Sequence, residues 1–331
     1  MSSQPETWLI TGGAGYIGAH VARSLVEANL AVVIVDNLST GIEGRLPLGV
    51  PFVEADCADA SAMHDVLIDH DVTGIVHLAA HKHARESINR PVFYWANNLG
   101  AMLGILQAAQ GTSVRKFLLS SSCSIYGASG AVSANSPANP LSPYARTKHS
   151  CEQALADCAG DLGISWIALR YFNVIGNGDF PHAHDTSAEC LVPVTIQRIF
   201  DGQPAVIYGT DFDTPDQTAL RDYIDVRDLA DVHVAAAQYL AGSNVSVGMT
   251  LDVGIGEPLS VRQLLTAMRE ELGKPFPVVD GGRLPGDPSA VWSHALAVRD
   301  TFAWQPKHSV RSSIAAHLKS LGRLDTGESR S

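Results

Sequence analysis

Short apolar segments alternate with amphipathic helical patterns over the first half of this 331-residue chain. Strands that are apolar throughout and are separated by helices are typical of a parallel sheet that helices cover on both faces. The alternation therefore predicts a doubly wound α/β fold. The expected strands are 8–11, 31–36, 52–56, 74–79, 116–120 and 166–170, and the expected helices are 16–28, 59–70, 91–110 and 144–160.

The sequence changes in character after residue 172. Residues 173–187 carry Gly, Asn, Asp, Pro and His and predict a loop. Further helices are expected at 188–201, 228–241 and 260–272, and a strand at 249–254. We therefore expect a large domain over 1–172, to which 225–255 returns. A smaller C-terminal α/β domain is expected from 173–224 and 256–321, and a disordered tail over 322–331.

The charge balance argues against two classes of partner. The net charge is −11 and the acidic residues are spread along the chain, so neither nucleic acid nor an anionic membrane is expected as the main partner. No apolar run approaches the roughly 20 residues that cross a bilayer. Residues 1–6 are polar and lead directly into a strand, so no signal peptide is expected.

The cysteines and histidines do not follow a metal-binding pattern. The five cysteines have no metal-ligand spacing and are interpreted as reduced thiols of a cytoplasmic protein. His182 and His184, next to Asp185, raise the possibility of a metal site. Two histidines in a polar loop are more often exposed to solvent, so no metal is predicted.

A glycine-rich turn, Thr11-Gly-Gly-Ala-Gly-Tyr-Ile-Gly18, follows the first expected strand and opens the first expected helix. The glycines permit a tight turn and let a pyrophosphate approach the backbone, where helix N–H groups bind it. An ordinary strand-to-helix turn is the alternative. Asp36, which closes the second strand, favours a dinucleotide, because an acidic residue there accepts from ribose hydroxyls and repels a 2′-phosphate. The pattern predicts a Rossmann-type site for NAD.

Tyr144 and Lys148 lie four residues apart and share one face of an expected helix. An ammonium beside a phenol stabilises the phenolate, so the pKa of the tyrosine is expected to fall from about 10 towards neutrality. Taken alone, such a pair is usually a solvated helix face. The serine-rich strand end at 120–122 and the glycine turn favour an acid/base tyrosine beside a nicotinamide instead.

Together these motifs resemble those of the extended short-chain dehydrogenase/reductases, and within them the NAD-dependent nucleotide-sugar epimerases of the UDP-glucose 4-epimerase type. The resemblance extends from about residue 7 to about residue 307. Its motifs are 11–18, 36–38, 79–82, 86–87, 97–98, 120–127, 142–144, Lys148, 170–173 and 221–224.

The resemblance implies a role for each matching residue. Ser122 would hold the reacting hydroxyl, Tyr144 would be the general acid and base, and Lys148 would lower the tyrosine pKa and bind the nicotinamide ribose. The implied NAD-binding residues are Gly12, Gly15, Tyr16, Ile17, Gly18, Asp36, Asn37, Asp56, Cys57, Leu78, Ala79, Ala80, Lys82, Asn97, Tyr144, Lys148 and Phe172. The implied substrate-binding residues are Ser122, Ser124, Tyr144, Asn173, Cys190, Leu191, Val206, Tyr208, Arg221, Arg283 and Asp287.

The resemblance also implies the reaction and the assembly. The sugar of a nucleotide sugar, a UDP-hexose above all, would be oxidised at carbon 4 to a keto intermediate, turn over in the pocket and be reduced on its opposite face. The protein would be a cytoplasmic homodimer, formed through helices 91–110 and 144–160.

The substrate side departs from the family pattern. Cys190 stands where Asn or His is common, Leu284 replaces one diphosphate-binding arginine, and Val291 occupies a position near the hexose. His83 and Arg85 stand where residues are normally small. These departures leave the redox residues intact, and they suggest a substrate other than UDP-glucose, such as one with an N-acetyl group.

Other activities share this fold and the Tyr/Lys pair. A 4,6-dehydratase normally has an Asp-Glu pair after the serine or threonine, where this chain has Cys123 and Ser124. A net dehydrogenase and an epimerase acting at another carbon are further alternatives. A non-enzymatic NAD sensor would tend to lose the Tyr/Lys pair, which is present here.

Overall fold

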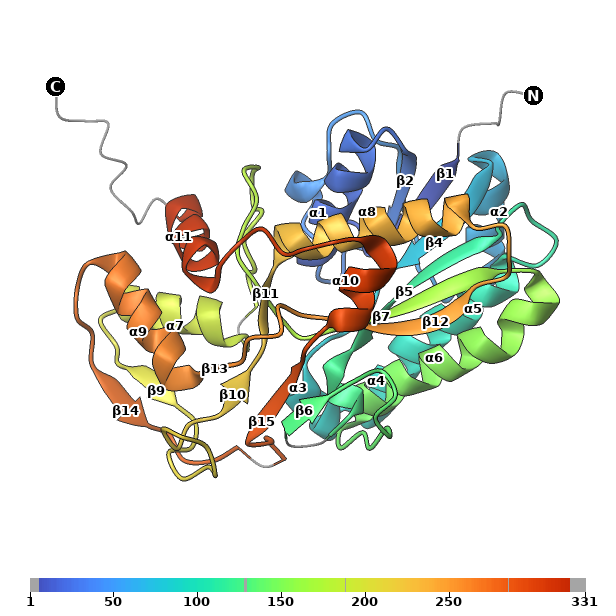
Figure 1. Ribbon diagram of the computed structural model, residues 1–331. Helices are drawn as coiled ribbons and strands as arrows, with labels where there is room; N and C mark the ends of the chain where they lie inside the picture. The colour runs from blue at the N-terminus through green and yellow to red at the C-terminus, as the bar shows by residue number, and fades with distance from the viewer. Residues whose placement is uncertain (1–5, 128–129, 188, 285, 322–331) are drawn as a thin grey trace, which may run out of the picture.

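A seven-stranded parallel sheet forms the larger part of the molecule (Figure 1). The computed structural model describes residues 6–127, 130–187, 189–284 and 286–321. The strand order is β3-β2-β1-β4-β5-β7-β12, so the order reverses between β1 and β4, where ligands bind in doubly wound folds. The strands are β1 (Thr7–Thr11), β2 (Ala31–Asp36), β3 (Phe52–Glu54), β4 (Val72–His77), β5 (Lys116–Ser122), β7 (Ser165–Tyr171) and β12 (Gly248–Val253).

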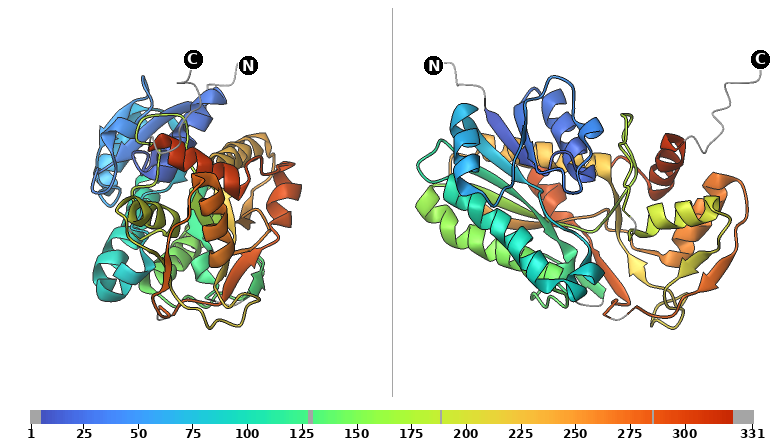
Figure 2. Two further views of the ribbon diagram at one scale, coloured as in Figure 1. Left: turned by 90° about the vertical axis from the view of Figure 1, so that its left-hand side faces the viewer. Right: turned by 180° about the vertical axis from the view of Figure 1, so that it is seen from behind.

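Helices cover both faces of this sheet, which confirms the predicted fold class (Figures 1 and 2). One face carries α1 (Tyr16–Glu27), α8 (Val226–Gly242) and α10 (Leu296–Phe302), and the other carries α2 (Ala60–Asp69), α5 (Gly100–Ala108) and α6 (Pro143–Leu162). Side chains of β1 alternate between the two cores, since Trp8 and Ile10 pack with α1 and α8 while Leu9 packs with α2 and α5.

The expected helix 91–110 is divided into three segments. These are α4 (Pro91–Tyr94), a π-helical turn η2 (Trp95–Leu99) and α5. Within η2, Asn98 accepts from the N–H of His81 at 2.8 Å and donates to its carbonyl at 3.0 Å. A single wide turn of this kind is typical of functional sites. A short helix that the sequence pattern did not predict, α3 (Ala84–Asn89), precedes α4.

The rest of the chain forms a C-terminal lobe with a smaller mixed sheet of order β13-β10-β15-β6. Ile196, Leu264 and Ile314 contribute to its core. The expected loop 173–187 begins with β8, which pairs in parallel with β11. The lobe and its connections comprise β6 (Gly130–Val132), β8 (Asn173–Ile175), α7 (Leu191–Phe200), β9 (Ala205–Ile207), β10 (Leu220–Arg221), β11 (Tyr223–Asp225), β13 (Leu259–Ser260), α9 (Val261–Leu272), β14 (Val278–Asp280), β15 (Ala290–Ser293) and α11 (Val310–Ser320).

Strand β12 lies at the edge of the large sheet beside β7, although two strands of the mixed sheet, β6 and β10, precede it along the chain and the other two follow it. Residues 248–253 therefore form the last strand of the large sheet. The domain boundaries near 172 and 255 stay predictions. The predicted tail, 322–331, lies outside the described residues.

A buried network of charges joins helix α6 to the sheet. Glu152 of α6 accepts two hydrogen bonds from the guanidinium of Arg170 on β7, at 2.9 and 2.6 Å, and a third from Ser121 on β5 at 2.5 Å. Arg170 also donates to the hydroxyl of Tyr126, which in turn donates to Asp252 of β12. Because each charge has a partner, the network can be buried without an unpaired ion.

Two further observations concern the chain as a whole. Across the residues that the structure describes, no helix combines the length and the apolar character needed to span a bilayer. All five cysteines are free thiols, and Cys57 and Cys151 are buried.

Candidate active site

The glycine turn joins β1 to α1 at the reversal in strand order. Gly12 has a φ of +72°, and a Cβ there would lie 2.7 Å from the backbone nitrogen of Ala79. At Gly18 a Cβ would lie 2.1 Å from the carbonyl oxygen of Gly12. Only glycine fits at these positions, because the turn packs directly against β4 and against the first turn of its own helix. A helix N-terminus that follows such a turn is a typical site for a phosphate.

Asp36 is buried at the end of β2 and holds the turn in place. One carboxylate oxygen accepts from the N–H of Ala14 at 3.0 Å, and the other accepts from the N–H of Leu38 at 2.9 Å. Burial raises the pKa of Asp36, and these two backbone hydrogen bonds oppose that rise. The residue predicted to select NAD therefore also fixes the backbone of the glycine turn.

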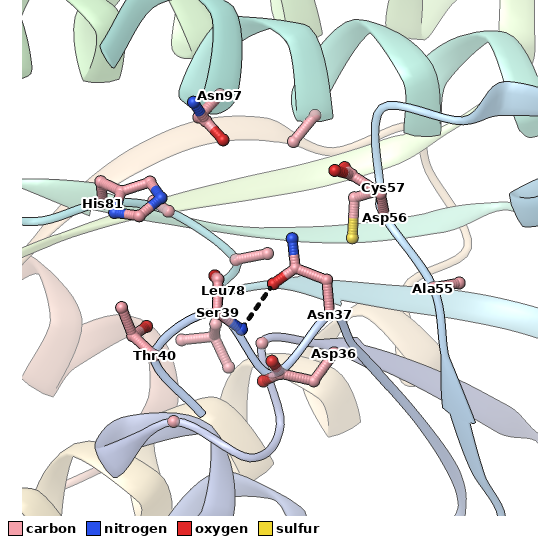
Figure 3. Close-up of a pocket in the computed structure, with 15 residues that line it drawn as sticks. Asp36, Asn37, Ser39, Thr40, Ala55, Asp56, Cys57, Leu78, His81 and Asn97 are labelled. Atoms are coloured by element: carbon pink, nitrogen blue, oxygen red, sulfur yellow. Dashed lines mark hydrogen bonds between the residues drawn. The ribbon is translucent and has the colours of Figure 1, made fainter. Parts of the chain in front are cut away.

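A pocket opens beside this turn, between the ends of the central strands and helix α5 (Figure 3). Figure 3 shows Asp36 and Asn37 on one side of it, Asp56 and Cys57 on another, and Asn97 above them. The predicted NAD-binding residues that line it are Gly12, Gly15, Asp36, Asn37, Asp56, Cys57, Leu78, Ala79, Ala80 and Asn97. Ser39, Thr40, Ala55, His81 and Ala101 line it as well and were not predicted to bind the cofactor.

The other predicted cofactor residues lie outside the lining of this pocket. Tyr16 is buried and donates to the carbonyl of Gly176 at 2.9 Å, and Ile17 packs against the core on the α1 side. Lys82 forms an ion pair with Asp185, with 3.3 Å between Nζ and Oδ1. Phe172 belongs to a separate buried cluster with Tyr126, Val132 and Val291. Gly18 is the position of close packing described above.

Ser122, Tyr144 and Lys148 come together where β5 ends and α6 begins. The Ser122 hydroxyl is close enough to the Tyr144 phenol to lower its pKa, and it lies 2.9 Å from the Ser124 hydroxyl. The Lys148 ammonium is buried and donates to the carbonyl of Ser120 at 2.9 Å. Ser142 caps the helix by accepting from the N–H of Ala145, so Tyr144 lies in a well-formed first turn.

The expected fall in the pKa of Tyr144 is wrong for the protein by itself. Burial raises the pKa of Tyr144 to about 12, and the hydrogen bond from Ser122 acts in the opposite direction. The sequence pattern placed an ammonium nearby, but it could not show how far the fold removes the half-buried phenol from solvent. Burial also lowers the pKa of Lys148, which Glu152 partly offsets. The phenol of the protein alone is therefore protonated at neutral pH.

The predicted substrate residues lie mainly on the C-terminal lobe. Arg221 of β10 pairs with Asp287 at 2.6 Å, and Arg283 pairs with Asp211 at 2.6 Å. Tyr208 follows β9 and is 37% exposed. Cys190 caps α7, Leu191 begins that helix, Val206 lies in β9, and Asn173 begins β8. Cys190 is close enough to Tyr144 to affect the pKa of the phenol.

A segment of the C-terminal part, residues 176–187, crosses back to the glycine turn and the loop after β2. The guanidinium of Arg45 donates to the carbonyls of His182 and His184, at 2.8 and 2.9 Å. The Lys82–Asp185 ion pair fixes the same segment on its other side. His182 is exposed and His184 is half-buried. Among the described residues, no group of three or more His, Cys, Asp or Glu side chains is arranged to hold a metal ion.

Comparisons with known proteins agree with this geometry. Residues 8–248 match the model of the NAD dependent epimerase/dehydratase family. A UDP-glucose 4-epimerase of Azospirillum brasilense is 36% identical over 317 residues, which cover 93% of this chain and 90% of that protein.

Solved structures give the same result. A UDP-glucose 4-epimerase from Stenotrophomonas maltophila, with bound NAD and formylated UDP-arabinopyranose, has a TM-score of 0.87 at 31% identity and covers 95% of this chain and 97% of its own. The UDP-Glc/GlcNAc 4-epimerase from Campylobacter jejuni has a TM-score of 0.83 at 30% identity, covering 96% of this chain and 100% of its own.

The chain therefore belongs to the NAD dependent epimerase/dehydratase family, among the extended short-chain dehydrogenase/reductases. In activity it is an NAD-dependent nucleotide-sugar 4-epimerase, and the predictions of the enzyme class and of NAD as the cofactor are confirmed.

A matched pair of glycine substitutions tests the glycine turn. Gly18→Ala places a Cβ against the carbonyl of Gly12, so we expect loss of NAD binding and a lower Tm. Gly160→Ala, within α6, meets no atom within 4 Å and should stabilise the protein by about 1 kcal/mol. NAD content and thermal unfolding would be measured for both variants. Equal behaviour of the two would show that the turn tolerates a side chain.

The ionisation of Tyr144 can be measured in protein freed of NAD. With a pKa of about 12, only about 1% of this phenol is ionised at pH 10, where a free tyrosine is about half ionised. The tyrosinate absorbance of the wild type minus that of Tyr144→Phe should therefore be near zero at pH 10. Ser122→Ala should raise the pKa further, because it removes the opposing hydrogen bond. A transition near pH 7 would contradict this assignment.

Proposed function

We propose that the enzyme epimerises a UDP-hexose at carbon 4 and that Ser122, Tyr144 and Lys148 perform the reaction. The observation that carries the proposal is the meeting of a serine hydroxyl, a half-buried phenol and a buried ammonium at the end of β5, two strands from β1 and its glycine turn in the same parallel sheet. Ser122 orients the 4-hydroxyl of the sugar. Tyr144 removes the proton from that oxygen and later returns it to the keto oxygen.

The residues around the glycine turn fit the cofactor. Gly12 and Gly15 line the pocket without a side chain, Asp36 lines it beside Asn37, and the N-terminus of helix α1 suits a pyrophosphate. When bound, NAD accepts the hydride from carbon 4 and returns it to the other face. Tyr144 needs a favourable positive field to ionise, because burial alone disfavours the phenolate. Lys148 supplies one positive charge in the same buried region.

The nucleotide end of the substrate would lie on the C-terminal lobe. Arg221 and the exposed ring of Tyr208 offer a cation and a stacking surface there. The Campylobacter jejuni protein is named for both UDP-Glc and UDP-GlcNAc, so both hexose types belong in a substrate panel. Val291 is buried beside Phe172 and Cys123. Because its side chain is small, it would leave space for a larger substituent on the sugar.

Elimination of water, as in a 4,6-dehydratase, is less well supported. Burial raises the pKa of the Cys123 thiol to about 12, and Ser124 contributes only a hydroxyl hydrogen-bonded to Ser122. Neither side chain is a carboxylic acid that could protonate a leaving hydroxyl near neutral pH.

Turnover by the wild type and by Tyr144→Phe tests the proposal. We expect the wild type to interconvert UDP-galactose and UDP-glucose, or their N-acetylated counterparts, as followed by NMR of the products. Tyr144→Phe should lose about 10³-fold or more in kcat while NAD stays bound, since it removes the acid/base group. Undiminished activity in this variant would exclude Tyr144. Accumulation of NADH with a keto product would indicate a dehydrogenase.

We also propose that the enzyme is a homodimer formed through α4, α5 and α6. Val92, Trp95 and Leu103 are apolar and exposed on the first two of these helices and the turn η2 between them. Leu103→Arg places a charge in this surface and should convert a dimer to a monomer, whereas Leu296→Arg, at an exposed position on α10, should not. Light scattering measures the mass in solution. A monomeric wild type would contradict the proposal.

A further inference from the structure

Helix α3 brings an arginine across to the C-terminal lobe. The guanidinium of Arg85 lies 5.3 Å from the ring centroid of Tyr208. Arg85 precedes α4 on the sheet side of the molecule, whereas Tyr208 follows β9 of the C-terminal lobe. A second contact crosses at the same place, because His83 lies 3.5 Å from Glu189, next to the cap of α7. The start of α3 therefore faces the lobe at two points.

Arg85 differs from the other two arginines of this region in its charge partners. Arg221 is paired with Asp287, and Arg283 is paired with Asp211. Among the described residues, the exposed Arg85 guanidinium forms neither an ion pair nor a hydrogen bond, and it lies against the face of the Tyr208 ring. Its donors are thus free for an incoming anion. A guanidinium is charged at any physiological pH and matches phosphate oxygens with paired N–H groups.

The same helix is tied directly to the catalytic tyrosine. The Ser87 hydroxyl accepts from the backbone N–H of Tyr144 at 3.1 Å, and it donates to the carbonyl of Ala84 at 2.5 Å. Arg85 is two residues before Ser87, so the same short helix contacts the first turn of α6 through Ser87 and the ring of Tyr208 through Arg85. In a nucleotide sugar the diphosphate lies between the sugar and the nucleoside. If the sugar lies at Tyr144 and the base lies at Tyr208, the negatively charged diphosphate between them is expected to lie near Arg85.

We propose that Arg85 binds the diphosphate of the substrate and thereby determines the specificity of this enzyme for nucleotide sugars. This inference rests on the proposed function. It explains how the site can bind a diphosphate while Leu284 contributes no charge, since helix α3 supplies the cation instead. Tyr208 has two uses in this arrangement: its ring holds the guanidinium before the substrate arrives, and it offers a surface to the base afterwards.

The test compares UDP with uridine, which lacks the phosphates. Binding of each would be measured by calorimetry on enzyme loaded with NAD, for the wild type, Arg85→Gln and Arg85→Lys. Arg85→Gln should weaken UDP binding about tenfold or more and change uridine binding less than about twofold. It should raise KM for the nucleotide sugar more than it lowers kcat. Arg85→Lys should recover part of the loss, because it keeps the charge without the paired donors.

Arg262→Gln is the matched control, since Arg262 is exposed on α9 and its side chain donates no hydrogen bond among the described residues. It should bind UDP like the wild type. Equal losses for UDP and uridine in Arg85→Gln would mean that Arg85 only holds the two parts of the protein together, and unchanged UDP binding would mean that it has no role; either result overturns the inference. A wild type that fails to bind UDP at all overturns the proposed function, and this inference with it.

Discussion

The ion pair between Glu152 and Arg170 determines how the active-site helix sits on the sheet. Tyr144, Lys148 and Glu152 follow one another at intervals of four along α6 and share one face of that helix. Glu152 is the anchor at one end, because Arg170 and Ser121 bind its carboxylate from two neighbouring strands. Arg170 also donates to the hydroxyl of Tyr126, and that hydroxyl donates to Asp252 on a third strand, β12. The phenol is thus placed by contacts made two helical turns away.

Helix α6 and the neighbouring strands place the charged side chains of Lys148, Glu152 and Arg170 together in a buried region. Lys148 is buried, and it is held by the carbonyl of Ser120 and the field of Glu152. His77 lies nearby, where burial and the charge of Lys148 lower its pKa to about 3, so it is neutral and shares a hydrogen bond with Thr11. The protein alone therefore holds a neutral phenol. In the proposed reaction, its ionisation would depend on charge that arrives with the ligands, which would link proton removal to the assembly of the complete complex.

Much of the fold could be predicted because its signals are local. An apolar strand, a glycine turn, a helix and a closing Asp36 occupy one continuous stretch, and each carries its own pattern. The local pattern placed His81 near the expected cofactor without assigning it to the pocket, and it gave no signal for Ala101, which follows the wide turn η2. Ser39 and Thr40 could have been predicted to line the pocket, because they are polar and lie only three and four residues after Asp36.

The tyrosine pKa and the substrate side were harder to predict for a related reason. Spacing identifies Lys148 as a neighbour of Tyr144, but burial is a property of the whole fold, and here it outweighs the neighbour. Pairs such as Arg221 with Asp287 and Arg85 with Tyr208 join segments far apart in the sequence. A single sequence contains no local pattern from which these long-range pairs could be predicted.

Hydrogen bonds to main-chain carbonyl groups account for most of the attachments of segment 176–187 to the glycine turn and to the loop after β2. Arg45 binds the carbonyl oxygens of His182 and His184, and Tyr16 binds that of Gly176. Carbonyl oxygens are present whatever the side chain is. The histidines can therefore be exchanged for other residues during evolution without releasing the segment, whereas a single change at Arg45 removes several of its attachments at once.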